Sequence, residues 1–166
     1  MPRILFSSTL LLLLTSCMYG QKTQADFHNM LADMYRYSVP LVKSAELKTD
    51  SSEVLLLDTR EKNEFEVAHL DGAKWVGYDD FQSEALAEVP KDKPIVVYCS
   101  VGYRSERIGE KLQEMGFTNV RNLYGGIFQW KNEGNDVVNK TGQSTEKVHT
   151  FNANWSQWLL KGEKVY

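Results

Sequence analysis

The stretch Ile95-Val96-Val97-Tyr98-Cys99-Ser100-Val101-Gly102-Tyr103-Arg104-Ser105 decides the fold of this chain. Its first four residues form a continuous apolar run, which is typical of a parallel strand buried on both faces. The apolar spacing between Ile108 and Met115 then predicts one buried face of a helix. Cys99 therefore lies where a strand ends and a helix begins, and helix N–H groups there favour thiolate over thiol. This segment predicts a sulfur nucleophile at the edge of a central strand.

Strand and helix patterns alternate on both sides of this segment. Apolar runs predict further strands at 54–57, 73–76 and 119–123, while apolar spacing predicts helices near 81–89 and from Ile127 onward. Such alternation is typical of an α/β domain with a mostly parallel central sheet flanked by helices in three layers. Ligands of such domains bind at the carboxyl ends of the strands, where Cys99 lies.

Two flanking segments extend this domain. Phe27 to Met34 carry apolar residues at helical spacing, which predicts a short amphipathic helix. After Asn139 a polar, loop-like stretch leads to a segment too apolar to remain in water, which contains Phe151, Trp155, Trp158, Leu159 and Leu160. We expect this C-terminal extension to pack on the domain, either by filling a surface groove or by lining the mouth of the active site.

The first residues have the pattern of an export signal. Arg3 is followed by a mostly apolar run, Ile4 to Leu14, which is far shorter than the roughly 20 residues that span a bilayer. Leu14-Thr15-Ser16-Cys17 resembles the lipobox of bacterial lipoproteins, which implies cleavage before Cys17 and acylation of that cysteine. We expect an exported, membrane-anchored lipoprotein of the bacterial cell envelope, facing the periplasm or in the outer membrane. The alternative is an ordinary secretory signal with an accidental cysteine.

Composition argues against several other classes of site. The formal net charge is −3 and no basic patch is visible, so a nucleic-acid partner is not expected. If Cys17 is lipidated, Cys99 is the single thiol, and a disulfide framework is not expected. His28, His69 and His149 are scattered, and Cys99 has no neighbouring ligand at zinc spacing, so neither a metal nor a cofactor is expected.

Three separated motifs resemble those of rhodanese-like domains. Asp58-Thr59-Arg60, Glu64-Phe65, His69-Leu70 and Gly72-Ala73 resemble the first signature, with Ala68 in place of the usual glycine. Cys99 to Ser105 is similar to the active-site loop Cys-x-x-Gly-x-Arg-Ser, and Leu123 to Trp130 resembles the C-terminal signature. The implied organisation is a lipoprotein signal (1–16), a tether with the N-terminal helix (17–38), a rhodanese-like domain (39–138) and the C-terminal extension (139–166).

The resemblance implies a sulfurtransferase of the thiosulfate:cyanide type. Cys99 would attack the outer sulfur of a small anionic, thiosulfate-like donor, become a persulfide and pass that sulfur to a thiol or to cyanide. The loop would wrap the persulfide, with backbone N–H groups of Ser100, Val101 and Tyr103 pointing inward and Gly102 allowing the tight curve.

The remaining site residues have alternative roles. Arg104 is placed either to favour the Cys99 thiolate and attract an anionic donor, or to bind an acidic side chain and hold the loop. Ser105 is expected to cap the following helix. Asp58 and Arg60 are expected to support the site by tying loops together.

Three other functions are weighed against sulfur transfer. Cell-cycle phosphatases of the dual-specificity type share this fold but place five residues between cysteine and arginine, whereas four lie between Cys99 and Arg104. A non-catalytic, partner-binding rhodanese-like module at the membrane surface is the second alternative. A thiol-redox role for Cys99 is the third, although the chain offers it no resolving cysteine.

Overall fold

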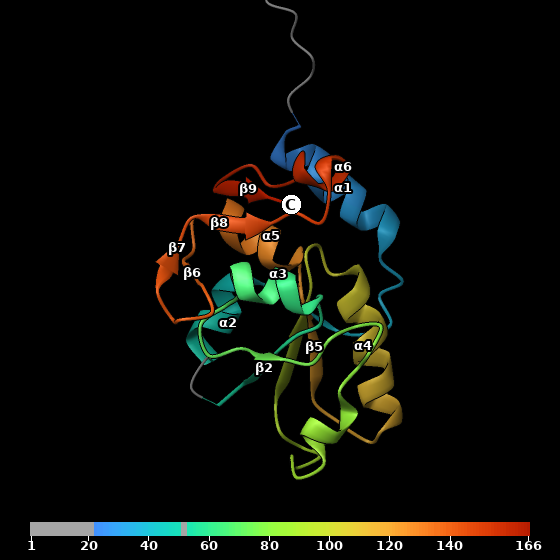
Figure 1. The fold of residues 1–166 in the computed structure, drawn as a ribbon. Helices are drawn as coiled ribbons and strands as arrows, with labels where there is room; N and C mark the ends of the chain where they lie inside the picture. The colour runs from blue at the N-terminus through green and yellow to red at the C-terminus, as the bar shows by residue number, and fades with distance from the viewer. Residues whose placement is uncertain (1–21, 51–52) are drawn as a thin grey trace, which may run out of the picture.

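A five-stranded, fully parallel sheet forms the centre of the molecule. The computed structural model describes residues 22–50 and 53–166 (Figure 1). The strands follow the order β1-β5-β4-β2-β3. They are β1 (Leu41–Val42), β2 (Leu55–Asp58), β3 (Lys74–Trp75), β4 (Ile95–Tyr98) and β5 (Val120–Leu123). The predicted α/β fold with a mostly parallel sheet is confirmed, and β4 is its central strand.

Helices cover both faces of this sheet. They are α1 (Gln24–Met34), α2 (Ser44–Asp50), α3 (Lys62–Val67), α4 (Tyr103–Glu114), α5 (Gly126–Asn132), α6 (Ala153–Ser156) and the 3₁₀ turn η1 (Ser83–Leu86). Side chains of β4 alternate between two cores, as the strand period of two requires. Val96 and Tyr98 join the core that contains α1 and α5, whereas Ile95 and Val97 pack with α4 and η1.

The sequence predictions were wrong at two helices. The helix expected over 81–89 is a single 3₁₀ turn whose preceding residue, Gln82, makes no capping bond through its side chain. Met115 was placed on the buried face of α4, but that helix ends at Glu114 and Met115 is exposed. The reason is Gly116, whose φ of +91° turns the chain out of the helix.

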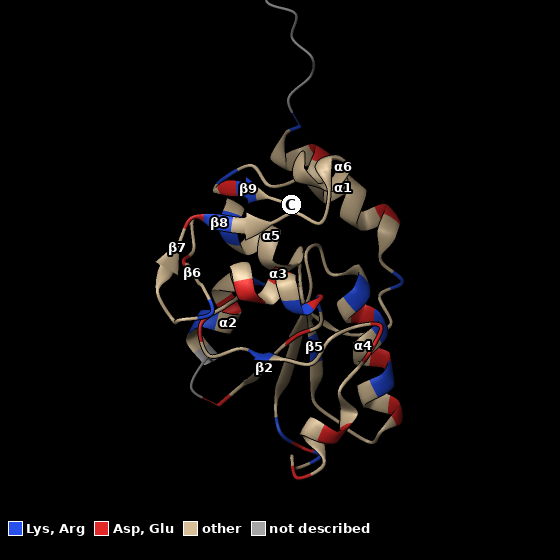
Figure 2. Ribbon diagram, viewed as in Figure 1, with Lys and Arg blue, Asp and Glu red and all other residues tan. Residues whose placement is uncertain are grey.

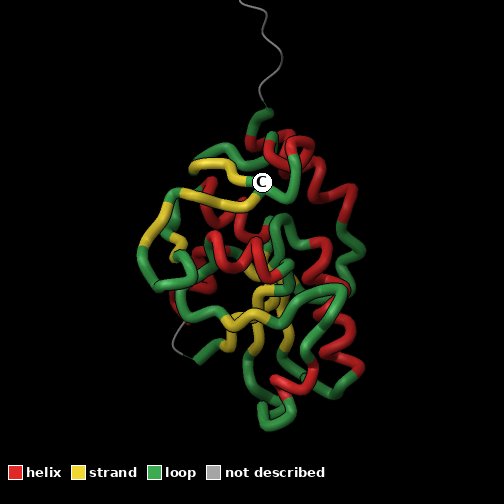
Figure 3. The backbone as a smooth tube through the Cα atoms, viewed as in Figure 1, coloured by secondary structure: helices red, strands yellow, loops and turns green. Residues whose placement is uncertain are grey.

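The chain from residue 137 onward forms more regular structure than the sequence predicted. Strand β6 (Val137–Val138) pairs antiparallel with β7 (Ser144–Thr145), and β8 (Lys147–His149) pairs parallel with β9 (Glu163–Val165). These short strands lie apart from the central sheet (Figure 3). The extension also reaches the N-terminal helix, because the rings of Trp158 and Phe27 are 5.9 Å apart. The described N-terminus and the C-terminus consequently lie at the same end of the molecule (Figure 1).

Charges are mixed along the surface elements. Figure 2 shows Lys and Arg interspersed with Asp and Glu along α4. No helix among the described residues is long and apolar enough to cross a bilayer. The expected signal segment and Cys17 lie outside the described residues.

Candidate active site

Cys99 lies directly after β4 and opens the loop that leads into α4. Its side chain is nearly buried but lines a pocket of about 360 Å³. The backbone N–H of Gly102 donates a hydrogen bond to Cys99 Sγ, with the two atoms 3.1 Å apart. An N–H group in this position stabilises negative charge on the sulfur.

The loop conformation depends on Gly102. Its φ is +98°, a left-handed conformation that glycine adopts without strain, and a Cβ atom there would collide with the side chain of Tyr35. The N–H groups of Ser100, Val101 and Tyr103 were predicted to surround the persulfide, and that role stays a prediction. In the resting protein the backbone N–H that donates to Cys99 Sγ belongs to Gly102. Gly102 thus supplies both the tight curve of the loop and a hydrogen bond to the sulfur.

The loop carbonyl groups are bound by neighbouring elements. The carbonyl oxygens of Cys99 and Ser100 accept hydrogen bonds from the N–H groups of Ile127 and Phe128, at 2.9 and 3.1 Å. The carbonyl of Gly102 accepts from Asn122 Nδ2 at 2.9 Å. Because these carbonyl oxygens are bound elsewhere, the sulfur of Cys99 faces the N–H of Gly102 and not a loop carbonyl oxygen.

Tyr35 holds the loop from the opposite side. Its hydroxyl donates to the carbonyl of Val101 at 2.6 Å and accepts from the N–H of Gly125 at 2.8 Å. Burial raises the pKa of Tyr35, so it remains a neutral donor. Tyr35 was not predicted as a site residue, because only the packing of α1 brings it to the loop.

Arg104 is bound to a buried carboxylate. Its Nη1 and Nη2 atoms donate to Glu64 at 2.7 and 2.9 Å, and Nη2 also donates to Ser100 Oγ at 3.0 Å. Burial by itself would raise the pKa of Glu64, but the hydrogen bonds and charge of Arg104, with a contribution from Arg60, hold it below its ordinary value. Burial would lower the pKa of Arg104, but the hydrogen bonds and charge of Glu64 and the electrostatic interaction with Cys99 raise it. The charge of Arg104 is therefore largely balanced by Glu64.

Asp58 and Arg60 form a fully buried ion pair behind the loop. Arg60 Nη2 lies 2.6 Å from Asp58 Oδ2 and 2.6 Å from the carbonyl oxygen of Ala68. Neither side chain lines the pocket that Cys99 opens into. Ala68 has an extended backbone with a φ of −162°, so the family's usual glycine is not required there.

Ser105 does not cap α4. That helix begins after Gly102, so Ser105 lies within its first turn. The Ser105 hydroxyl is buried and donates to Asn122 Oδ1 at 2.7 Å. Because Asn122 in turn binds the carbonyl of Gly102, Ser105 positions the loop indirectly. The expectation of a cap was therefore wrong.

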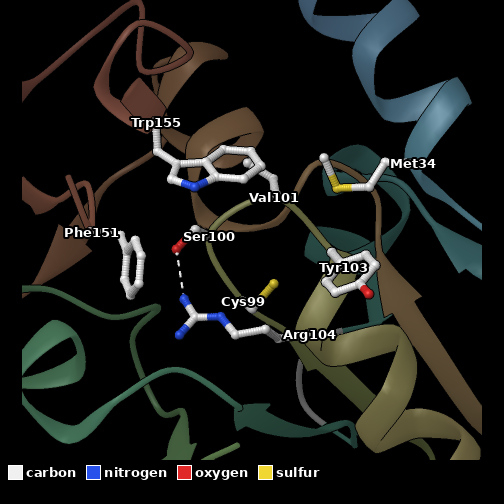
Figure 4. Close-up of a pocket in the computed structure, with 8 residues that line it drawn as sticks. All are labelled: Met34, Cys99, Ser100, Val101, Tyr103, Arg104, Phe151 and Trp155. Carbon is white, nitrogen blue, oxygen red and sulfur yellow. Dashed lines mark hydrogen bonds between the residues drawn. The ribbon is translucent and has the colours of Figure 1, made fainter. Parts of the chain in front are cut away.

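Three side chains from outside the central domain complete the pocket. Met34 comes from α1, while Phe151 and Trp155 come from the C-terminal extension (Figure 4). Phe151 is held at a positive φ of 64°, and its N–H donates to His149 Nδ1 at 3.1 Å. The Arg104 guanidinium lies 5.7 Å from the centre of the Phe151 ring. The extension thus lines the active-site mouth, which was the second of the two arrangements expected from its sequence.

The histidines have structural partners. His69 stacks on Phe65 at 3.9 Å between ring centres, and its Nδ1 lies 2.9 Å from the carbonyl oxygen of that residue. Over residues 22–50 and 53–166, no group of three metal-ligating side chains gathers in one place.

The arrangement matches a known family. The family model described as the rhodanese-like domain matches residues 41–133. The chain belongs to the rhodanese-like family. Its α/β sheet, cysteine loop and two flanking signatures all lie within, or directly at, this match, whereas α1 and α6 lie outside it.

Relatives of the rhodanese-like chain include sulfurtransferases and hydroxylases. A tRNA uridine(34) hydroxylase from Erwinia tasmaniensis is 33% identical over 96 residues, covering 54% of this chain and 27% of that protein. The probable adenylyltransferase/sulfurtransferase MoeZ of Mycobacterium tuberculosis is 36% identical over 76 residues, covering 45% and 19%.

A solved structure supports the same family. The thiosulfate sulfurtransferase of Pseudomonas aeruginosa superimposes with a TM-score of 0.56 and 27% identity, covering 61% of this chain and 20% of that one. This rhodanese-like chain therefore spans at most 27% of each of these three longer proteins.

Proposed function

We propose that this rhodanese-like protein is a sulfurtransferase of the thiosulfate:cyanide type that carries sulfur as a persulfide on Cys99. The observation that carries the proposal is the position of Cys99 Sγ, which opens into a pocket and accepts a hydrogen bond from the N–H of Gly102 at 3.1 Å. The similarity to MoeZ, a probable adenylyltransferase/sulfurtransferase, and to the thiosulfate sulfurtransferase of Pseudomonas aeruginosa supports the same reaction class.

The proposed reaction has two displacement steps. In the first, the Cys99 thiolate attacks the outer sulfur of thiosulfate, the sulfur–sulfur bond of the donor breaks, and sulfite leaves with the bonding electron pair. In the second, cyanide or an acceptor thiolate attacks the outer sulfur of the persulfide. The Cys99 sulfur–sulfur bond then breaks, and thiocyanate or an acceptor persulfide leaves while the Cys99 thiolate is restored.

The loop residues have separate tasks in this reaction. The N–H of Gly102 stabilises charge on Sγ in the resting thiolate. Arg104 lies at the pocket wall, where it orients an anionic donor while Glu64 fixes its guanidinium. Asp58 and Arg60 tie the end of β2 to the carbonyl of Ala68 after α3, and neither side chain lines the pocket.

Intact mass spectrometry tests the proposal directly. The purified protein treated with thiosulfate should gain one sulfur atom, about 32 Da, and cyanide should remove it as thiocyanate. Cys99→Ser should never show the gain, because a serine hydroxyl cannot carry a persulfide. Cys17→Ser, which changes the other cysteine, should still show it. A folded wild-type protein that gains no mass with thiosulfate or mercaptopyruvate would overturn the proposal in favour of a partner-binding or redox module.

We also propose that the protein is an envelope lipoprotein anchored through Cys17. The support is the short apolar segment followed by Leu14-Thr15-Ser16-Cys17. In the bacterial host, Cys17→Ser should move the protein from the membrane fraction to the soluble fraction. Continued membrane association of that variant would contradict the proposed anchor.

A further inference from the structure

The pocket above Cys99 is lined mainly by apolar and aromatic side chains. Eight residues line it, and they are Met34, Cys99, Ser100, Val101, Tyr103, Arg104, Phe151 and Trp155. The indole of Trp155 and the ring of Phe151 lie on one side of the sulfur, and Met34 and Tyr103 lie on the other (Figure 4). Such walls gain free energy by excluding water from an apolar group rather than by solvating an inorganic anion.

We propose that the favoured sulfur donor of this site is an organic one, in which the transferable sulfur is joined to an apolar group that packs against Phe151 and Trp155. The chemical class is an organic persulfide or thiosulfonate, R–S–S⁻ or R–SO₂–S⁻, with R an aryl or alkyl group. This inference rests on the proposed sulfur transfer through Cys99 and names its substrate class.

The charge at the pocket agrees with a donor of low charge. Arg104 is the one cationic side chain among the eight lining residues, and Glu64 binds it with two hydrogen bonds of 2.7 and 2.9 Å. Because Glu64 is fully buried, its charge is screened little by water and offsets that of Arg104. A dianion such as thiosulfate therefore meets little uncompensated positive charge. A monoanionic donor needs less positive charge from the site to bind.

Part of the apolar pocket lining comes from outside the residues that the family model matches. The rhodanese-like match ends at residue 133 and begins at residue 41, so Met34, Phe151 and Trp155 all lie outside it. Phe151 keeps a left-handed backbone and remains 53% exposed, although an unconstrained apolar side chain gains more by burial. The bond from its N–H to His149 fixes it at the pocket mouth.

The pocket volume also suits an organic donor. About 360 Å³ is within the range of small-molecule sites, which runs from about 300 to 1,000 Å³. This volume is large enough for an aromatic ring together with the reacting sulfur.

Sulfur transfer from a thiosulfonate to Cys99 is a single displacement at sulfur. The Cys99 thiolate attacks the terminal sulfur of R–SO₂–S⁻, a new sulfur–sulfur bond forms, and the old one breaks. The sulfinate R–SO₂⁻ leaves with the electron pair, and Cys99 becomes a persulfide anion. No oxidant or reductant is consumed.

Two thiosulfonates of equal charge test the inference. Benzenethiosulfonate and methanethiosulfonate differ only in the apolar group, and their reaction with glutathione in solution corrects for intrinsic reactivity. We expect kcat/KM of the purified protein to favour benzenethiosulfonate by about tenfold beyond that reference ratio, as burial of one ring predicts. Trp155→Ala should reduce the preference to about threefold or less, mainly through KM.

Leu160→Ala is the matched control, because Leu160 lies in the same extension and is exposed without lining the pocket. It should retain the wild-type preference. A preference equal to the glutathione reference in the wild-type protein would overturn the inference even if Trp155→Ala cannot be folded. In that outcome both donors still load sulfur onto Cys99, so the proposed function stands. Failure of every donor to add sulfur would overturn both.

Discussion

The hydroxyl of Tyr35 donates a 2.6 Å hydrogen bond to the carbonyl oxygen of Val101, so the residue directly after α1 holds the cysteine loop in place. The same hydroxyl accepts from the N–H of Gly125, which precedes α5. One buried side chain thus connects the N-terminal helix to two loops at the carboxyl edge of the sheet. Tyr35 lies outside the residues matched by the family model.

Removal of this hydroxyl should weaken the loop. Tyr35→Phe leaves the carbonyl of Val101 and the N–H of Gly125 without that partner in a buried site, which costs about 1–3 kcal/mol. Urea denaturation measures the loss, and sulfur loading of Cys99 should slow in parallel. Tyr37→Phe, on an exposed ring, should change neither quantity by comparison. Equal stability of the two variants would contradict the role assigned to Tyr35.

Alanine substitutions at two glycines with similar φ angles distinguish backbone strain from a steric collision with a neighbouring side chain. Gly102→Ala should destabilise the protein by more than about 2 kcal/mol, because it combines a left-handed φ with a collision against Tyr35. Gly116→Ala has a similar φ of +91° but open space around the new methyl group. It should cost about 1 kcal/mol. Thermal unfolding of both variants measures the loss of stability. A larger loss for Gly116→Ala than for Gly102→Ala would contradict the prediction.

Replacement of Glu64 should expose the unbalanced charge of Arg104. Glu64→Gln keeps the shape of the side chain but removes the partner of a mostly buried guanidinium, at a cost of about 3 kcal/mol at pH 7. Glu163→Gln, in a loose surface pair with Lys147 at 4.0 Å, should cost less than about 1 kcal/mol. Guanidinium chloride denaturation of both variants at pH 7 measures the difference.

The same carboxylate predicts part of the acid sensitivity. The pKa of Glu64 is lower in the folded protein than its ordinary value of 4.5, so its stabilising effect is complete above pH 4.5 and is lost as the pH falls below it. The unfolding free energy of the wild-type protein should therefore decline more steeply below pH 4.5 than that of Glu64→Gln. Parallel pH profiles for the two proteins would argue against this assignment.

His149 should make the pocket wall sensitive to mild acid. Burial lowers its pKa below 6.5, with Arg60 and Arg104 acting in the same direction and Glu64 acting against it. The folded state thus favours the neutral ring, whose Nδ1 accepts from the N–H of Phe151, and this contribution is lost as the pH falls below the lowered pKa.

Hydrogen exchange at Phe151 measures this effect. The protection factor of its amide should fall as the pH is lowered from 7.5 to 5 in the wild-type protein. In His149→Asn the side-chain oxygen replaces Nδ1 as an acceptor but does not titrate, so protection should change little. A fall of equal size in both proteins would show that another group governs the wall.

The sequence predicted the fold and the nucleophile through local chemistry. Continuous apolar runs predicted the buried parallel strands, and the order Cys99, Gly102, Arg104 predicted the loop between strand and helix. The hydrogen bond from the Gly102 N–H to the resting sulfur was not predicted, because backbone dihedral angles at Gly102 decide where this amide points. Ser105 was misassigned as a helix cap, since α4 begins three residues earlier than a cap at Ser105 requires.

What the sequence by itself determined is the alternation of strands and helices around Cys99 and the identity of the thiol, because hydrophobic periodicity and motif spacing are properties of neighbouring residues. What only the tertiary structure decided is which distant side chains surround that thiol. Tyr35 and Trp155 are separated from Cys99 by many residues in the chain, and the packing of α1 and the C-terminal extension brings them to the loop. Such contacts depend on the burial of whole elements against each other, a long-range effect that local patterns do not encode.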